Sequence, residues 1–258
     1  MKEYSITQYI LFVLIISCLL LYGCKSSTTS PTQSVQKSIP IFVDGLLVYY
    51  PFDGDASDAS GHGRIGTIVG ATLTSDRFGN ANAAYSFDST RYISVQNSDT
   101  LKFTQALTLS AWVYEKQIGN YPGIISKGNV GNYGESFAIY TSPLNKIGFL
   151  INISGTQTGR YLLESYDTLS LNAWTHIVCT YDGTMMCLYL NGQLARTNYF
   201  PGSIFNTTDN ILIGKSDRSN STNSPTFFDG YIDEVYIMNR ALSSAEILQM
   251  YNQSRVAN

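Results

Sequence analysis

Short segments rich in β-branched and aromatic residues recur from residue 46 to residue 238, and turn residues separate them. Such segments are typical of β-strands, because branched and ring side chains fit a pleated, half-buried surface. They predict strands at 46–52, 83–87, 92–95, 107–115, 123–127, 136–141, 146–151, 160–165, 174–181, 185–192, 210–214 and 230–238. Many short strands with no helix between them predict an all-β fold, a sandwich of two sheets.

One helix is predicted after the last strand. Ser243 and Glu246 have the spacing of a capping box, in which each side chain bonds the backbone N–H of the other residue. Ile247, Leu248 and Tyr251 follow with the spacing of an apolar helical stripe. The folded region therefore ends in a short amphipathic helix.

The start of the chain has the pattern of an export signal. A charged beginning leads into an apolar run from Tyr9 to Tyr22, and a small residue and Cys24 follow it. This order predicts a signal peptide at 1–23, and the cysteine after the cut resembles the lipidation site of bacterial lipoproteins. Acylated Cys24 would anchor the protein on a membrane surface of the bacterial cell envelope, outside the cytoplasm, because two or more acyl chains bind a membrane stably. Plain secretion and an uncleaved anchor are the alternatives, although the run is shorter than the roughly 20 residues that cross a bilayer.

Composition separates a tether from one folded domain. Residues 24–40 are polar and rich in serine and threonine, so they are predicted to form a disordered tether. Residues 41–254 have the length of one domain, and abundant tyrosine, phenylalanine and glycine suit strands joined by tight turns. The net charge is only -3 and no cluster of Lys or Arg occurs, which argues against a nucleic-acid partner.

Five segments, taken in order, carry a family resemblance: 45–88, 107–114, 174–195, 211–216 and 228–247. They include GLLVYYPFDGDASDASGHG, LTLSAWVY, WTHIVCTYDGTMMCLYLNG, ILIGKS and FDGYIDEVYIMNRALSSAEI. Together they resemble the laminin-G-like jelly roll of the concanavalin A-like lectin/glucanase superfamily. The resemblance implies two curved antiparallel sheets with the first and last strands adjacent. It also implies a module that binds carbohydrate or protein, often with a structural calcium.

An acidic, glycine-rich loop follows the first predicted strand. Asp53, Asp55 and Asp58 alternate along it, which suits a hard cation such as calcium, or else a solvated turn. The resemblance adds that Asp58 and Ser60 match the family's aspartate-x-serine-glycine step, and that Asp233 matches the aspartate of its last strand. We therefore expect a structural calcium ion, with Asp53, Asp58, Ser60 and Asp233 among its ligands.

The carboxylate pattern of a glucanase is missing. Asp233 and Glu234 are neighbours on a predicted strand, so their side chains are expected on opposite faces. An enzyme of this superfamily would carry glutamates and an aspartate on one face, whereas the glutamates of this chain are scattered. The sequence therefore predicts no enzyme activity and a surface-anchored binding module. A polysaccharide-active enzyme, with carboxylates from distant strands roughly 5–10 Å apart, is one alternative. A purely structural or adhesive envelope protein is the other.

Aromatic and polar residues at loops and rims are the ligand candidates, because a flat ring stacks on the face of a sugar and a hydroxyl adds a hydrogen bond. The family resemblance implies that Trp112 and Trp174 lie within core strands, so both are expected in the core rather than at a binding site. The segment 127–136 is rich in glycine and asparagine, which is typical of a binding loop and also of a plain hairpin loop. The candidates are Tyr121, Asn132, Tyr133, Arg160 and Tyr161. The expected partner is a glycan or an envelope or extracellular protein, and the membrane is contacted only through the lipid anchor.

Two cysteines flank a predicted hairpin turn at 182–184. A three-residue loop would pair Tyr181 with Met185 and place Cys179 opposite Cys187. The oxidising location would permit a disulfide between them. Cross-strand geometry is tight for a disulfide, so two free cysteines remain the alternative.

Overall fold

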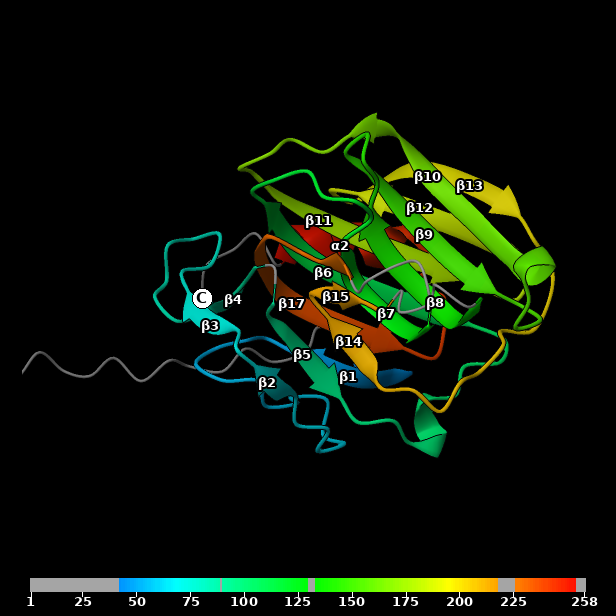
Figure 1. The fold of residues 1–258 in the computed structure, drawn as a ribbon, viewed down its shortest axis with the longest axis horizontal. Coiled ribbons are helices and arrows are strands. Elements are labelled where there is room, and N and C mark those ends of the chain that lie inside the picture. The colour runs from blue at the N-terminus through cyan, green and yellow to red at the C-terminus, as the bar shows by residue number, and fades with distance from the viewer. Residues whose placement is uncertain (1–41, 89, 130–132, 218–225, 254–258) are drawn as a thin grey trace, which may run out of the picture. The chain divides into compact units, whose positions relative to one another are not determined.

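Two antiparallel sheets face each other in the computed structural model, which describes residues 42–88, 90–129, 133–217 and 226–253 (Figure 1). Sheet A contains β1 (Leu46–Tyr50), β3 (Thr72–Thr74), β4 (Ala84–Phe87), β6 (Leu107–Glu115), β11 (Trp174–Tyr181), β12 (Met185–Leu190), β13 (Gln193–Tyr199) and β17 (Gly230–Met238). Sheet B contains β2 (Thr67–Val69), β5 (Tyr92–Val95), β7 (Gly123–Asn129), β8 (Gly134–Thr141), β9 (Lys146–Asn152), β10 (Arg160–Thr168) and β14 (Ile211–Ile213). The smaller elements are β15 (Lys215–Ser216), β16 (Thr226–Phe227), the 3-10 turns η1 (Asp99–Leu101) and η3 (Gln157–Gly159), and helix α2 (Ser244–Gln253).

The order of the strands confirms the predicted jelly-roll sandwich. Sheet A runs β13-β12-β11-β6-β17-β4-β3, with β1 also paired to β17, and sheet B runs β10-β9-β8-β7-β14-β5-β2. The first and last long strands are therefore neighbours, as the family resemblance implies. Strands β5, β6, β11 and β17 begin and end at the predicted residues. The prediction missed β13, whose residues are largely exposed because it forms the edge of sheet A, and the short strands β2, β3, β15 and β16.

Alternate residues of the central strands fill the space between the sheets. From sheet A this core takes Leu107, Leu109, Ala111, Val113, Ile177 and Cys179, and from sheet B it takes Ile125, Phe137, Ile139, Phe149, Ile151 and Ile213. Each is fully or almost fully buried. Full burial of one such leucine, isoleucine or phenylalanine stabilises a fold by about 1.5–3 kcal/mol relative to exposure. The residues between them point away from the core, and this sets which side chains reach the two outer faces.

Helix α2 covers part of the outer face of sheet A and lies behind that sheet in the view of Figure 1. Ile247 and Met250 of the helix are buried in a cluster that contains Tyr49, Val178 and Tyr236 of the sheet. The predicted capping box is confirmed, since Ser243 Oγ accepts the N–H of Glu246 and Glu246 Oε2 accepts the N–H of Ser243. No helix in the described part of the chain is long and apolar enough to cross a membrane.

A β-bulge interrupts β17 in the middle of sheet A. The register shifts between Asp233 and Tyr236, and Glu234 has a φ of 51°, in the left-handed region. The part of β17 before the bulge pairs with β4, and the part after it pairs with β1. The bulge therefore changes the direction of the two acidic side chains at its centre.

The hairpin between β11 and β12 differs by one residue from the prediction. Tyr181 pairs with Met186 rather than Met185, and Cys179 pairs with Leu188. The Asp182 carboxylate accepts the N–H of Met185 at 2.7 Å, which lengthens the turn. A shift of one residue exchanges the two faces of a strand. Cys179 accordingly lies in the inter-sheet core, whereas Cys187 packs against the cluster on the outer face, and both are free thiols.

Candidate functional site

The first acidic residue of the expected calcium site, Asp58, organises its own loop. Its Oδ1 accepts the backbone N–H groups of Tyr49, at 3.1 Å, and Ser60, at 2.9 Å. Its Oδ2 accepts the N–H of Arg64 at 2.9 Å, and the Ser60 hydroxyl donates to the carbonyl of Leu47 at 3.1 Å. A carboxylate offers about four lone-pair directions, and backbone donors use three of them here. The loop is therefore attached to β1 by hydrogen bonds from Asp58.

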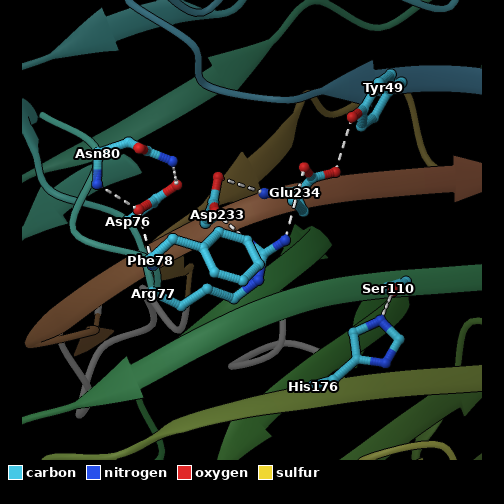
Figure 2. A network of polar contacts seen from close by, with 9 residues as sticks. All are labelled: Tyr49, Asp76, Arg77, Phe78, Asn80, Ser110, His176, Asp233 and Glu234. Atoms are coloured by element: carbon cyan, nitrogen blue, oxygen red, sulfur yellow. Dashed lines mark hydrogen bonds and ion pairs between the residues drawn. The ribbon is translucent and has the colours of Figure 1, made fainter. Parts of the chain in front are cut away.

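The second residue, Asp233, lies in a buried ion network on the outer face of sheet A. Figure 2 shows the side chain of Arg77 reaching both acidic residues at the bulge. Its Nη1 donates to Asp233 Oδ2 at 2.6 Å, and its Nη2 lies 3.9 Å from Glu234 Oε1. The hydroxyl of Tyr49 donates to Glu234 Oε2 at 2.7 Å. The prediction that Asp233 and Glu234 face opposite sides is wrong, because the bulge breaks the alternation between them.

Burial controls the electrostatics of this network. The side chains of Arg77, Asp233 and Glu234 are 7%, 3% and 14% exposed. Desolvation raises the pKa of Glu234 to about 7, against the opposing charge of Arg77. Desolvation and the charge of Glu234 also raise the pKa of Asp233. The guanidinium of Arg77 lies 4.7 Å from the ring centroid of Trp112, a buried residue of this outer face rather than of the inter-sheet core.

The positive charge beside Asp233 is therefore the guanidinium of Arg77, whereas the sequence analysis predicts a calcium ion there. Asp58 accepts three backbone N–H groups, and Asp233 accepts the guanidinium of Arg77 and the N–H of Glu234, so both acids already have partners within the protein. Within the described ranges, no group of three or more His, Cys, Asp or Glu residues could hold a metal ion. Asp53 lies close enough to Glu234 to raise its pKa further. Calcium binding by this domain stays a prediction.

Two of the predicted ligand residues come together at the hairpin between β7 and β8. The guanidinium carbon of Arg160 lies 5.8 Å from the ring centroid of Tyr133, and Arg160 forms an ion pair with the buried Glu135. The carbonyl of Tyr133 accepts the side-chain amide of Asn152 at 2.8 Å. Asn132, the third candidate of this segment, lies outside the described residues.

The other two candidates lie elsewhere. Tyr161 stacks on Phe200, with ring centroids 4.4 Å apart, and packs against the inter-sheet core. Tyr121 precedes β7, at the opposite end of that strand from Tyr133, and its ring meets that of Tyr140 edge-on at 5.6 Å. The predicted ligand residues therefore do not form one site.

A hollow of about 410 Å³ opens on the outer face of sheet B, over strands β5, β14 and β7. This volume lies within the range of about 300–1,000 Å³ that is usual for small-molecule sites. The lining includes Tyr92, Ser94, Asp209, Asn210, Lys215 and Asp217. Gly128 of β7 also lines it and pairs with Glu135, the partner of Arg160. The hollow thus lies near the end of the sheet that carries Arg160 and Tyr133.

A chain of hydrogen bonds connects the hollow to the protein interior. The ammonium of the fully buried Lys127 donates to Asn97 Oδ1 at 2.9 Å and to the carbonyl of Leu101 at 2.6 Å. The N–H of Asn97 donates to Asn210 Oδ1 at 3.0 Å. The Nδ2 of Asn210 in turn donates to Ser94 Oγ at 3.0 Å. A buried cation therefore holds two side chains of the hollow through Asn97.

The lining combines hydrogen-bond acceptors, donors and an aromatic ring. Asp209 and Asp217 bring carboxylates, and Lys215 brings an ammonium 4.6 Å from the ring centroid of Tyr92. Desolvation lowers the pKa of Lys127 below the hollow to about 8, and the negative charge of Asp209 opposes this shift. Such a combination can hydrogen-bond a polyhydroxylated ligand that both donates and accepts.

None of the named ligand candidates lines this hollow, although Gly128 lies in the segment 127–136 that sequence reasoning interpreted as a binding loop or a plain hairpin loop. The alternation in the strand 92–95 does place Tyr92 and Ser94 on one face, and this was the available signal. Asp209 and Lys215 join them only because β14 lies between β7 and β5. That strand order depends on pairings between distant parts of the chain, which no local pattern shows.

Comparison with known proteins agrees with this architecture. A family model described as the concanavalin A-like lectin/glucanases superfamily, Laminin_G_3, matches residues 87–248, which is more than half of the chain. No curated protein matches the chain. Domain 4 of AbnA, a GH43 extracellular arabinanase from Geobacillus stearothermophilus solved in complex with arabinotriose, is similar in structure, with a TM-score of 0.63 and 19% identity. The similarity covers 80% of this chain and 98% of that domain.

Toxin binding domains have the same fold. The binding domain of Paraclostridial Mosquitocidal Protein 1 matches with a TM-score of 0.67 and 17% identity, over 84% of this chain and 54% of that chain. A botulinum neurotoxin type C structure, whose cell entry depends on two ganglioside molecules, matches with a TM-score of 0.61 and 14% identity. There the similarity covers 84% of this chain and 53% of the toxin chain, so this protein spans about half of both toxin chains. With its residues 87–248 matched, this chain belongs to the concanavalin A-like lectin/glucanases superfamily.

Proposed function

We propose that this protein is a non-catalytic glycan-binding module and that the hollow on the outer face of sheet B is its binding site. The observation that carries the proposal is the lining of the hollow, where the carboxylate of Asp209, the hydroxyl of Ser94 and the ring of Tyr92 surround one space. Sugars are bound by such groups, because their hydroxyls donate and accept while their C–H faces pack on rings. The arabinanase domain of the same fold, solved with arabinotriose, supports this choice of ligand.

The position of the perturbed acids supports binding without turnover. A glycosidase needs a carboxylic acid with a raised pKa and a second carboxylate across the scissile bond. In the described part of the chain, raised carboxyl pKa values are found at Glu115, Asp233 and Glu234. Asp233 and Glu234 interact with Arg77, and Glu115 is buried with Thr141 as its hydrogen-bond partner. None of these three acids lines the hollow of sheet B.

A glycan array tests the proposal directly. The full-length protein, purified in detergent, is expected to bind a subset of glycans, and calorimetry then gives the affinity for each bound glycan. Asp209→Ala is expected to weaken this affinity about tenfold to a hundredfold, because a hydrogen bond to a charged group contributes about 1.5–3 kcal/mol. Asp167→Ala, at an exposed position of β10, is the matched control and is expected to leave the affinity unchanged.

Two results would contradict the proposal. Binding of no glycan, or equal binding by wild type and Asp209→Ala, would remove the hollow as the site. Release of reducing ends from a bound glycan, lost in Asp209→Asn or Asp217→Asn, would identify an enzyme instead.

We also propose that Cys24 carries a lipid anchor that holds the module on a membrane surface outside the cytoplasm. The support is the order of an apolar run, a small residue and this cysteine at the start of the chain. Palmitate is expected to label the wild type, and Cys24→Ala is expected to lose both the label and the membrane fraction. Cys18→Ala, within the apolar run, is the matched control and should keep both. A wild-type protein that is unlabelled and absent from the membrane fraction would contradict the anchor.

A further inference from the structure

We propose that one end of the sandwich docks on the surface of a zwitterionic lipid bilayer. This loop end is formed by residues 116–122 between β6 and β7, 142–145 between β8 and β9, and 169–173 between β10 and β11. No residue of these three loops is among the described residues that line the hollow of sheet B. Docking at the loop end is therefore independent of glycan binding.

Hydrogen bonds hold the three loops together. The carboxyl of Glu115, just before the first loop, accepts the hydroxyl of Thr141, just before the second, at 2.6 Å. Asn145 of the second loop exchanges two hydrogen bonds with Leu169 of the third, both at 2.7 Å. The N–H of Asn172 donates to the carbonyl of Glu115 at 2.8 Å, which connects the third loop to the first. The three loops therefore form one continuous surface.

Each loop exposes one large aliphatic side chain. Leu144 is 69% exposed, Ile118 is 49% exposed and Leu171 is 37% exposed. A single exposed leucine is ordinary on a protein surface, but three such side chains on adjoining loops mark a contact with a protein or a membrane. Tips on separate loops can each enter a fluid layer of lipid, whereas a rigid protein would need a matching hollow for each. We therefore favour a bilayer as the occupant.

Partly exposed aromatic residues lie behind the tips, on the outer face of sheet A. Tyr231 of β17 and Trp174 of β11 are the two register partners of Tyr114 of β6, and their ring centroids lie 5.1 and 5.7 Å from that of Tyr114. The hydroxyls of both tyrosines and the indole N–H of Trp174 form no hydrogen bond with the described part of the chain. Rings with an apolar body and a free polar group are enriched at the level of lipid headgroups.

The ammonium of Lys116 completes this layer. It lies 4.1 Å from the ring centroid of Tyr231 and forms no ion pair with any carboxylate of the described residues. A lysine beside interfacial rings can reach the phosphate of a lipid headgroup while its methylene groups stay against apolar surface. Aliphatic tips, then rings, then an ammonium thus follow the order of depth in a membrane interface.

The small charge of the loop end favours a zwitterionic lipid. Lys116 is the one charged residue within the three loops, and Lys146, Asp167 and Asp229 flank them. Two lysines and two aspartates leave no excess of either sign. The buried Glu115 adds little, because desolvation raises its pKa to about 7. Attraction to anionic lipid is therefore not what would hold this surface on a membrane.

The chain enters the sandwich at the other end. β17 runs from Gly230, which pairs with Glu115, to Met238, which pairs with Leu46 at the start of β1. Its nine residues, at about 3.3 Å each, separate the two ends by roughly 30 Å. To reach the membrane that holds Cys24 under the proposed anchor, the domain would have to turn over. The occupant that we propose is therefore a second bilayer.

Two populations of vesicles test this docking. The full-length protein is reconstituted into phosphatidylcholine vesicles, and protein-free vesicles of brominated phosphatidylcholine are then added. The wild type is expected to cluster the two populations and to lose tryptophan fluorescence, because bromine quenches an indole on close contact. The chain has two tryptophans and Trp112 is buried, so Trp174→Phe should lose most of the quenching.

Matched substitutions assign the contact to the loop end. Leu144→Asp is expected to weaken clustering and quenching about tenfold, because a carboxylate is costly in an apolar layer. Ile118→Asp should have the same effect. Leu194→Asp, at a 54% exposed position of β13, is the control and should change neither readout. Thermal melting checks that each variant is folded.

Four results would overturn the proposal. They are no quenching of the wild type, equal effects of Leu144→Asp and Leu194→Asp, a requirement for anionic lipid, and quenching only when the brominated lipid is in the vesicles that hold the protein. Quenching reports docking even for a protein without an anchor, so failure of the anchor and failure of the docking are distinguishable. The vesicles contain no glycan, so none of these results bears on the hollow of sheet B.

Discussion

Single residues determine the charge arrangement on the outer face of sheet A. Arg77 meets Asp233, which is 156 positions away in the chain, and the left-handed backbone of Glu234 turns that side chain towards the same guanidinium. Sequence reasoning identified Asp233 through the family resemblance. It could not identify its partner, because neither the loop that carries Arg77 nor the bulge leaves a local signal. Asp233 could thus be identified from the sequence, whereas its pairing with Arg77 depends on the tertiary fold.

Replacement of Arg77 should therefore be costly. Arg77→Met leaves two buried carboxyl groups without their counter-charge, and such a loss typically costs about 3–5 kcal/mol of unfolding free energy. Denaturant unfolding at pH 7.5 measures this loss of unfolding free energy. Arg91→Met, which removes a half-exposed pair with Asp88, should cost about 0–1 kcal/mol. Equal losses in the two variants would show that the buried network contributes nothing specific.

At the scale of secondary-structure elements, a local sequence pattern is sufficient to predict some strands and the helix but not others. Strand β6 and helix α2 were predicted well, because alternation and a capping box are properties of contiguous residues. The edge strand β13 was missed, since its exposed positions remove the apolar signal. The register of the β11–β12 hairpin was missed by one residue, because the Asp182 side chain bonds the N–H of Met185 and enlarges the turn.

Helix α2 offers a matched pair of substitutions. Met250 is 1% exposed and faces the sheet, whereas Leu248 is 40% exposed on the same helix. Met250→Ala is expected to lower the unfolding free energy by about 2–5 kcal/mol, because it leaves a cavity under the helix. Leu248→Ala should change it by no more than about 0.5 kcal/mol. Thermal or urea unfolding checks the difference, and comparable values would contradict the packing described for α2.

The loop at Asp58 tests both a structural role and the predicted calcium ion. Asp58→Ala removes three hydrogen bonds from backbone N–H groups and is expected to lower the unfolding free energy by about 2–4 kcal/mol. Asp55→Ala, which loses the hydrogen bond that the Asp55 carboxylate accepts from the N–H of Ser57, should cost about 1 kcal/mol. Thermal melting of the same samples with and without a chelator tests whether calcium stabilises the domain. A melting temperature that falls and recovers with calcium, but poorly with magnesium, would support the ion, and an unchanged value would contradict it.

At the scale of the whole domain, the two sheets are connected by a polar contact at one end of the sandwich. Glu115 of sheet A accepts the hydroxyl of Thr141 of sheet B at 2.6 Å, and its other oxygen has no hydrogen-bond partner among the described groups. Burial raises the pKa of Glu115 to about 7, and the bond from Thr141 opposes the shift. A buried carboxyl of this kind makes the stability of the sandwich depend on pH.

The sign of this dependence follows from proton binding. Between pH 4.3 and 7 the folded state keeps a proton on Glu115 that the unfolded state, with its ordinary pKa of about 4.3, has lost. The stabilisation that this proton gives the folded state is fully present below about pH 4.3 and is lost as the pH rises through about 7. Glu115→Gln has no such proton. The variant should therefore gain about 2 kcal/mol relative to wild type between pH 5 and pH 8.

Denaturant unfolding of both proteins across this range measures the difference. The variant Glu164→Gln, at a partly exposed position of β10, is the control for a general effect of removing a carboxyl group. A difference between Glu115→Gln and wild type that does not change with pH would contradict the raised pKa of Glu115.

The point at which the chain enters the sandwich affects how the hollow of sheet B is presented to a ligand. Phe42, the first described residue, packs against the cluster on the outer face of sheet A, and the hollow lies on the opposite face of the domain. A domain held through the residues before Phe42, as the proposed anchor requires, would be attached at the face opposite its hollow, so the attachment itself would leave the hollow uncovered. Neighbouring copies on one membrane would then display many copies of the same site. A long polysaccharide could engage many of them at once, so that avidity rather than single-site affinity would decide how firmly it is retained.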